Sequence, residues 1–141
     1  MTMPLWVLLI FTVWTILVLL AGVGVHRWSL ILSRKAELTY FRADRVEGPP
    51  FYHRAMRAHA NCVENLPVYA ALALIAAVIS LDTLLLDRLA LAVLAGRVCQ
   101  TFTHMAFVET NITVAIRFVF FFVQLAAMLA MAYIIAVFAL A

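Results

Sequence analysis

Charged residues are scarce in this chain of 141 residues. Only 12% of them are Asp, Glu, Lys or Arg, whereas 67% are hydrophobic. Soluble domains average about 25% charged and about 45–50% apolar residues, so this balance excludes a water-soluble core. The sequence therefore predicts an integral membrane protein, and its length predicts a single domain.

Several motifs of catalytic and metal sites are also missing. The sequence contains no glycine-rich phosphate loop, Ser-His-Asp arrangement, paired carboxylates, HExxH or CxxC. Its two cysteines, Cys62 and Cys99, lie in apolar segments, so we expect buried free thiols. A haem between His59 and His104 would need both rings in one cavity, but His59 points away from the polar side of its own helix. We therefore expect no metal site.

The basic residues are concentrated in one segment. Seven of the ten Lys and Arg residues are Arg27, Arg34, Lys35, Arg42, Arg45, Arg54 and Arg57. Such an excess of positive charge in one loop of a membrane protein places that loop in the cytoplasm, and both termini outside. Because the net charge of +3 arises from this loop, it does not indicate nucleic-acid binding.

Four apolar segments predict an all-α membrane domain built as a four-transmembrane-helix bundle. The spans cover about residues 5–25, 51–80, 89–107 and 114–140. Each is long enough to cross a hydrocarbon core of about 30 Å. The first run lacks the basic start of a secretory signal, so we interpret it as a retained span. The multi-pass domain then includes residues 1–141.

Local signals predict where the helices start, stop or bend. The loop after the first span has helix-forming character up to about Val46, and the Gly-Pro-Pro stretch at 48–50 ends it. Pro67 should kink the second span. Asp82 and Asp87 are the expected caps around the turn before the third span.

The second span opens with a polar stripe formed by Arg54, Arg57, Asn61 and Glu64. At about 100° per residue these four positions fall within about 80° of arc on a helix. Two guanidinium groups, an amide and a carboxylate on one face can bind a zwitterion that carries carboxylates. Alternatively, the two arginines lie near lipid headgroups and one of them satisfies Glu64.

The third span carries a second stripe, with Arg97, Gln100 and His104 at i, i+3 and i+7. An arginine deep in a membrane helix costs about 2.5–3.5 kcal/mol on insertion scales, so Arg97 needs a reason. One explanation is an ion pair with Glu64 across two helices. A second is functional: the polar groups in the cytoplasmic half of the spans outnumber what pairing requires, which favours a polar site open to the cytoplasm.

The segment RAMRAHANCVENLP resembles the signature of the membrane-associated proteins in eicosanoid and glutathione metabolism, the MAPEG family. The Gly96-Arg97-Val98 step is similar to a family pattern in the third span. The resemblance implies a homotrimer of four-helix subunits, with glutathione bound between neighbours near the cytoplasmic side. Members conjugate glutathione to lipophilic electrophiles, reduce lipid hydroperoxides or isomerise prostanoid-like substrates, and one only presents lipid. A bacterial-type member would lie in the inner (cytoplasmic) membrane.

Roles for individual residues follow from the same resemblance. Arg57, Asn61 and Glu64 match positions that hold the ends of the tripeptide. The implied binding set for glutathione as co-substrate is Arg54, Arg57, Asn61, Glu64, Arg97, Gln100 and His104. Arg117 resembles the catalytic arginine that faces the thiol in active members. A nearby guanidinium lowers the pKa of a thiol and so favours the nucleophilic thiolate.

The chain departs from active members after Arg117. Phe118 and Phe121 stand where some of them have a serine and a tyrosine, and neither phenylalanine can donate a hydrogen bond. Two functions are therefore expected. One is a glutathione-dependent transferase or peroxidase acting on a lipophilic small-molecule substrate that arrives through the membrane lipids. The other is a non-catalytic, lipid-binding or structural subunit of a larger membrane complex.

Overall fold

The computed structural model describes residues 1–41 and 47–140, and the described residues are helical without a β-strand. The long helices are α1 (Met3–Val18), α3 (Pro50–Val78), α4 (Leu84–Ala106) and α5 (Asn111–Leu140), and α1 continues through the π-helical η1 (Leu19–Gly24) into α2 (Val25–Leu32). A short 3-10 helix, η2 (Leu38–Tyr40), follows in the first loop.

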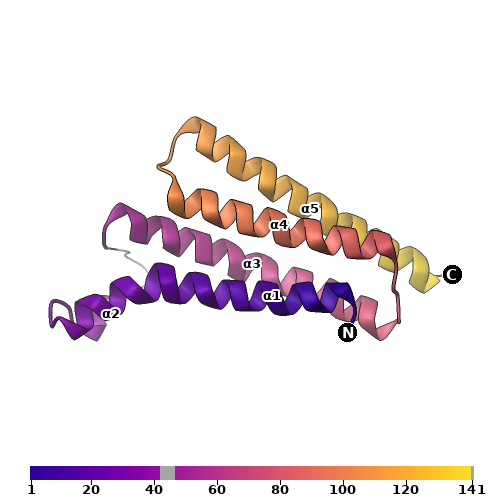
Figure 1. The fold of residues 1–141 in the computed structure, drawn as a ribbon, viewed down its shortest axis with the longest axis horizontal. Coiled ribbons are helices and arrows are strands. Elements are labelled where there is room, and N and C mark those ends of the chain that lie inside the picture. The colour runs from indigo at the N-terminus through magenta and orange to yellow at the C-terminus, as the bar shows by residue number, and fades with distance from the viewer. Residues whose placement is uncertain (42–46, 141) are drawn as a thin grey trace.

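The four long helices run side by side as a bundle (Figure 1). Helix α1 packs on α3 and α4, α3 also packs on α4, and α5 lies mainly along α4. Both termini and the turn between α3 and α4 lie at one end, whereas α2 and the turn between α4 and α5 lie at the other (Figure 1). The predicted all-α bundle is confirmed, and the basic first loop leaves the bundle at the α2 end.

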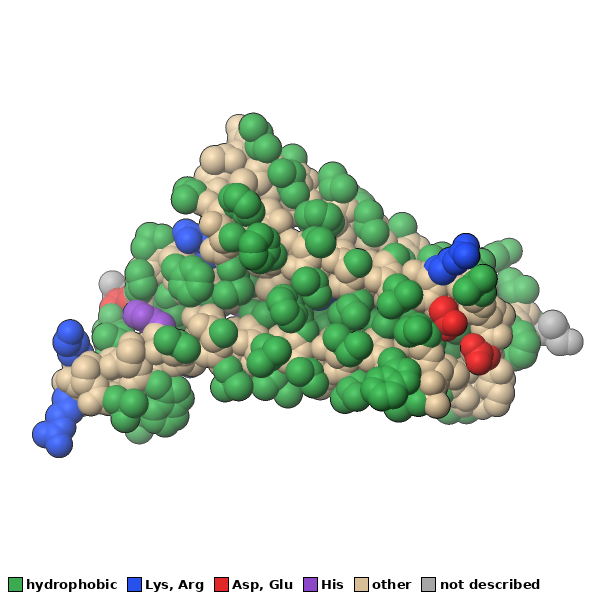
Figure 2. Space-filling view, in the orientation of Figure 1, with side chains coloured by type: hydrophobic (Ala, Val, Ile, Leu, Met, Phe, Trp, Pro, Cys, Tyr) green, Lys and Arg blue, Asp and Glu red, His purple; other side chains and the backbone are tan. Residues whose placement is uncertain are grey.

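Within the described part of the chain, three helical segments are long and apolar enough to cross a membrane: Met3–Leu32, Pro50–Val78 and Asn111–Leu140. Helix α4 is less apolar than these three segments, but most of its polar side chains point into the bundle. Arg97, Gln100, Thr101, Thr103 and His104 are all buried. Figure 2 shows one face on which hydrophobic side chains cover the middle of the bundle and charged side chains lie toward its ends.

The apolar core lies toward the end of the bundle that carries the termini. Phe11 of α1, Tyr69 of α3, Leu86 of α4 and Met131 of α5 are fully buried in one cluster. The hydroxyl of Tyr69 donates a hydrogen bond to the carbonyl of Pro4, 3.0 Å away, which fixes the start of α1 on α3. Because this end is filled with apolar side chains, the buried polar groups collect at the opposite end.

The first loop differs from the prediction. The first helix extends to Leu32 instead of ending near Val25, because η1 continues it without a break. Arg34 then adopts a φ of 55°, which a right-handed helix cannot contain. Only the turn of η2 follows, so the extended helix expected up to Val46 is wrong for residues 33–41, while its part at 42–46 lies outside the described residues.

Two further predictions about local structure need correction. Thr83, not Asp82, caps α4: its Oγ1 accepts a hydrogen bond from the backbone N–H of Leu86, 3.2 Å away. Asp87 lies inside the first turn of α4. Cys62 is a buried free thiol as predicted, but Cys99 is exposed because it lies on the outward face of α4.

Helix α3 contains two prolines, one in its first turn as expected and one in its interior. Pro50 occupies the first turn, where its missing N–H costs nothing. Pro67 lies inside the helix, which continues beyond it to Val78.

Gly22 lets η1 approach α3 closely, and this contact gives a first prediction. A Cβ added at Gly22 would lie 2.8 Å from the Cβ of Ala55, whereas one at Gly24 would meet its nearest neighbour at 3.4 Å. Gly22→Ala should therefore destabilise the protein by about 1–3 kcal/mol through overpacking. Gly24→Ala, the matched control, should not. Thermal unfolding in detergent measures both, and equal midpoints would contradict the close contact.

Candidate functional site

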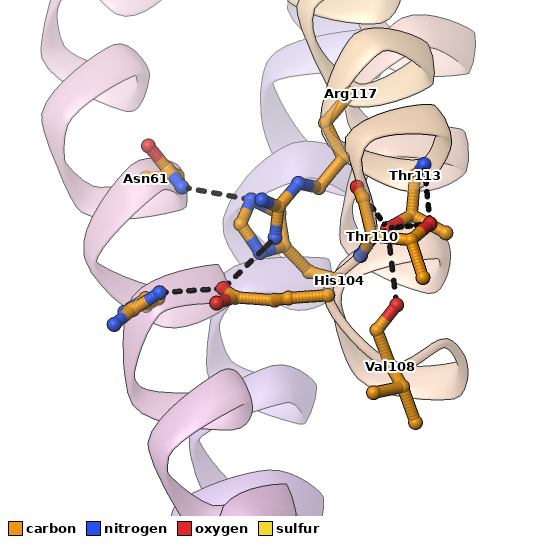
Figure 3. A network of polar contacts seen from close by, with 8 residues as sticks. Asn61, His104, Val108, Thr110, Thr113 and Arg117 are labelled. Atoms are coloured by element: carbon orange, nitrogen blue, oxygen red, sulfur yellow. Dashed lines mark hydrogen bonds and ion pairs between the residues drawn. The ribbon is translucent and has the colours of Figure 1, made fainter.

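A polar network joins three helices at the α2 end of the bundle. The Nη1 of Arg117, on α5, donates a hydrogen bond to Nδ1 of His104, on α4, over 2.9 Å. The other ring nitrogen of His104 lies 3.3 Å from Nδ2 of Asn61, on α3. Figure 3 shows these three side chains converging from their helices. The guanidinium of Arg117 is thus positioned by the bundle, and its side chain is only 13% exposed.

The hydrogen-bonding capacity of arginine defines the state of His104 in this network. A guanidinium can only donate, so Nδ1 of His104 must be the accepting nitrogen. The neutral ring then carries its proton on Nε2 and needs an acceptor there. Since amide nitrogen and oxygen are interchangeable by rotation, the side-chain oxygen of Asn61 is the group that suits this contact. A positively charged imidazole would face the guanidinium directly and break the arrangement.

Glu109, in the turn between α4 and α5, links this network to Arg57. Its Oε1 lies 2.5 Å from Nη1 of Arg57 and 3.4 Å from Nη1 of Arg117. Arg57 and Glu109 are both accessible, with side chains 62% and 43% exposed. The guanidinium of Arg57, together with that of Arg117, holds the pKa of the Glu109 carboxyl below its usual range. The carboxylate is therefore charged at neutral pH.

That depressed pKa predicts a titration. The Arg57–Glu109 pair stabilises the fold above the pKa of an unfolded glutamate, and this contribution is lost as the pH falls through the lower pKa of the folded state. The Glu109 carboxyl should titrate with a midpoint below the ordinary value of about 4.3. Carbon-13 NMR of glutamate-labelled protein measures it, and Arg57→Gln should raise the midpoint. An unshifted midpoint in the parent protein would contradict the pairing.

Two cavities border this network. The inner cavity, of about 280 Å³, is lined by Asn61, Gln100, His104, Val114, Arg117, Phe118 and Phe121. The outer cavity, of about 450 Å³, is lined by Gly48, Pro50, His53, Arg54, Arg57, Val108 and Glu109. The inner cavity combines one guanidinium with aromatic walls, whereas the outer cavity has two arginines near the loop.

Gln100 is held in place by a hydrogen bond from Gln124 of α5. The side-chain amide nitrogen of Gln124 donates to Oε1 of Gln100 over 3.0 Å and to the carbonyl of Phe120 over 2.8 Å. Gly96 leaves room for this contact, since a Cβ there would lie 2.8 Å from Cγ of Gln124. Gln124 thus supports a wall of the inner cavity.

The predicted ion pair between Arg97 and Glu64 is not present. Arg97 is only 1% exposed, with its guanidinium 5.7 Å from the ring centre of Phe11, and its Nε and Nη2 have no hydrogen-bond partner among the described residues. Glu64 is exposed and makes no ion pair with any described residue. The cause is the rotation of α3, because the helix face with Cys62 and Tyr69 points inward and Glu64 lies on the other side.

The predicted binding set is therefore divided. Asn61, Gln100, His104 and Arg117 meet at the inner cavity. Arg54 and Arg57 line the outer cavity, and Glu109 connects the two groups. Glu64 and Arg97 contact neither cavity within one chain.

Comparison with known proteins decides the family. The model of the MAPEG family matches residues 3–137, which is nearly the whole chain. The chain belongs to the MAPEG family. Neither the curated proteins nor the solved structures contain a match. Membership places this MAPEG chain among integral membrane proteins of a group linked to glutathione and eicosanoids.

Glu109 is the site residue that sequence reasoning missed. It stands in the short VETNIT stretch, which carries no family motif. No sequence signal points to its contact with Arg57, because Arg57 lies on α3, which does not adjoin the α4–α5 turn along the chain.

Proposed function

We propose that this MAPEG protein is a glutathione-dependent transferase or peroxidase acting on lipophilic electrophiles from the bilayer. The observation that carries the proposal is the position of Arg117, which lines the inner cavity and is fixed by His104. A largely buried guanidinium beside an aromatic cavity suits a thiolate and an apolar co-substrate together. Electrostatic stabilisation of this kind acts most strongly where water is excluded.

The chemistry needs no covalent intermediate with the protein. Arg117 stabilises the thiolate of glutathione, whose sulfur forms a bond to an electrophilic carbon while the leaving group departs with its electron pair. With a hydroperoxide, the sulfur attacks the terminal oxygen and the alcohol leaves. A second glutathione then forms the disulfide and water is released. Arg57 binds a carboxylate of the tripeptide, for which the planar fork of arginine is well suited.

One measurement tests this function directly. Addition of glutathione to the purified protein should produce the ultraviolet absorbance band of a thiolate at a pH where free glutathione is mostly protonated. S-methylglutathione, which cannot ionise at sulfur, is the matched control and should give no band. Absence of the band together with absence of glutathione binding would contradict the proposal.

A second candidate function is a non-catalytic, lipid-binding or structural role in a larger membrane complex. The specific observation that favours it is the wall of the inner cavity, where Phe118 and Phe121 lie beside Arg117. Neither side chain can donate a hydrogen bond to a thiolate. Glutathione binding without any thiolate band or turnover would select this second function.

We further propose that the chain works as a homotrimer. Glu64 supports this proposal, because an exposed carboxylate on a membrane helix is costly unless a neighbouring molecule covers it. A second copy that faced this side of α3 could offer one of its own basic or amide groups. Native mass spectrometry from mild detergent should therefore give a trimer, and a stable monomer would count against it.

The topology that we propose places the α2 end of the bundle in the cytoplasm and both termini outside. The basic first loop supports this orientation. An impermeant thiol reagent added to intact cells should label a cysteine at Thr83 and miss one at Ser33, in a variant whose native cysteines are replaced. The reverse pattern would overturn the orientation.

A further inference from the structure

The turn between α4 and α5 is built to hold Glu109 in place. The hydroxyl of Thr113 donates to the carbonyl of Val108 over 3.0 Å. The backbone N–H of Thr113 donates to Oγ1 of Thr110 over 3.2 Å, and the N–H of Thr110 donates to Oγ1 of Thr113 over 2.8 Å. Figure 3 shows this cluster beside the Arg117–His104 contact. Glu109 thus comes from an ordered turn and not from a loose loop.

A single oxygen of Glu109 contacts both arginines that the proposed function assigns to glutathione. Oε1 lies 2.5 Å from Arg57 and 3.4 Å from Arg117. Arg57 lines the outer cavity and Arg117 the inner one. The carboxylate therefore lines the outer cavity and also contacts an arginine of the inner one, with the same chemistry as the carboxylate of a bound tripeptide.

We propose that Glu109 is a specificity-determining residue: an internal carboxylate that an entering anionic ligand must displace, with the ligand's carboxylate replacing it at Arg57 and the ligand's thiolate replacing it at Arg117. This proposal rests on the proposed function, and it adds that Glu109 makes the site select ligands that carry a carboxylate over neutral ones. A ligand that carries a carboxylate exchanges one anionic partner of the arginines for another. A neutral ligand has nothing to exchange, so Glu109 keeps its contacts with both arginines.

Glu109→Gln keeps the size of the side chain and removes its charge, so it tests this competition. Glutathione should bind to the variant about 3- to 10-fold more tightly, because no charged internal partner has to leave. Isothermal titration of the detergent-solubilised protein measures this dissociation constant. Glu109→Asp, whose shorter side chain reaches less far toward Arg117, should lie between the parent and Glu109→Gln. Asp82→Asn removes one exposed carboxylate at the opposite end of the bundle and should bind like the parent.

A second assay does not depend on glutathione. Phenylglyoxal modifies accessible arginines, and peptide mass spectrometry locates the modification at Arg57 and Arg117. Succinate, a simple dicarboxylate, should protect both positions at about 3- to 10-fold lower concentration in Glu109→Gln than in the parent protein. Succinamide, which has the same shape without charge, should protect neither protein.

The outcomes separate this proposal from the proposed function. Tighter glutathione binding and easier protection by succinate in Glu109→Gln would support the competition. Unchanged or weaker binding in that variant, or the same gain in Asp82→Asn, would overturn it while leaving the proposed function intact. If neither protein binds glutathione, the proposed function fails, and the succinate assay alone decides the role of Glu109.

Discussion

Replacement of Arg117 by alanine should lower the turnover of glutathione conjugation about 100-fold. Loss of one preorganised group that stabilises developing or fixed negative charge typically costs about 100- to 1000-fold in rate. We expect the lower end of this range, because the thiolate is already anionic when it is bound. Part of its attraction to Arg117 therefore stabilises the bound state and does not lower the barrier of the reaction. None of the described residues that line the inner cavity carries a hydroxyl group that could replace the guanidinium.

The pH dependence of the same variant distinguishes a catalytic role from a structural one. Without Arg117 the pKa of the bound thiol should rise, so the rate should reach half of its maximum at a higher pH than in the parent. Arg117→Lys restores the charge without the planar fork and should recover only part of the rate. Arg88→Ala, an exposed arginine near the other end of α4, is the control and should leave rate and profile unchanged.

Conjugation of a generic aromatic electrophile measures these rates. A variant Arg117→Ala that conjugates as fast as the parent would contradict the role assigned to Arg117. The replacement also removes the hydrogen-bonding partner of His104. A loss of rate without any shift in the pH profile would therefore point to structural damage around His104 instead of a catalytic role for Arg117.

The architecture could be predicted from the sequence because apolar runs of membrane length leave few alternatives. A hydrocarbon solvent requires each spanning segment to satisfy its own backbone hydrogen bonds, so an apolar run of this length must be helical. The motif around Arg57 and Asn61 likewise identified the family and the end of the bundle that carries the site. The loop around Arg34 was less predictable, since its helix ends through one left-handed residue without a glycine or proline to signal it.

The contacts within the site could not be predicted, because the spacing along one helix does not define the rotation of that helix against its neighbours. Asn61 and Glu64 share a stripe in the sequence, yet Asn61 reaches His104 while Glu64 points away. The apolar face with Tyr69 packs on α1 and turns Glu64 outward. A pairing of Arg97 with Glu64 was reasonable by charge and depth, but it assumed a rotation that the core does not allow.

The role of the α4–α5 turn was hidden for a related reason. Glu109 is separated from Arg57 by 52 residues, and its contact arises only because α3 and α5 start at the same end of the bundle. Turn residues have no helical periodicity from which a facing partner could be inferred. The carboxylate that organises the two arginines therefore becomes visible only when the helices are assembled.

Replacement of Arg57 by alanine should weaken glutathione binding and leave the ionisation of any bound thiol nearly unchanged. A charged hydrogen bond contributes about 1.5–3 kcal/mol, and we expect the lower half of this range because the Arg57 side chain is 62% exposed. The dissociation constant should rise about 12- to 40-fold. Isothermal titration measures it, and saturating glutathione should restore most of the turnover.

The same replacement also releases Glu109, which makes the double variant informative. In Arg57→Ala the carboxylate of Glu109 keeps only its longer contact with Arg117, so it is a weaker competitor for the ligand. Glu109→Gln should then improve binding less in the Arg57→Ala background than in the parent protein, which a double-mutant cycle expresses as a coupling between the two residues. Equal gains in both backgrounds would show that Arg57 and Glu109 act independently. The loss of binding in Arg57→Ala would then have to arise from Arg57 alone, without any exchange of carboxylates between Glu109 and the ligand.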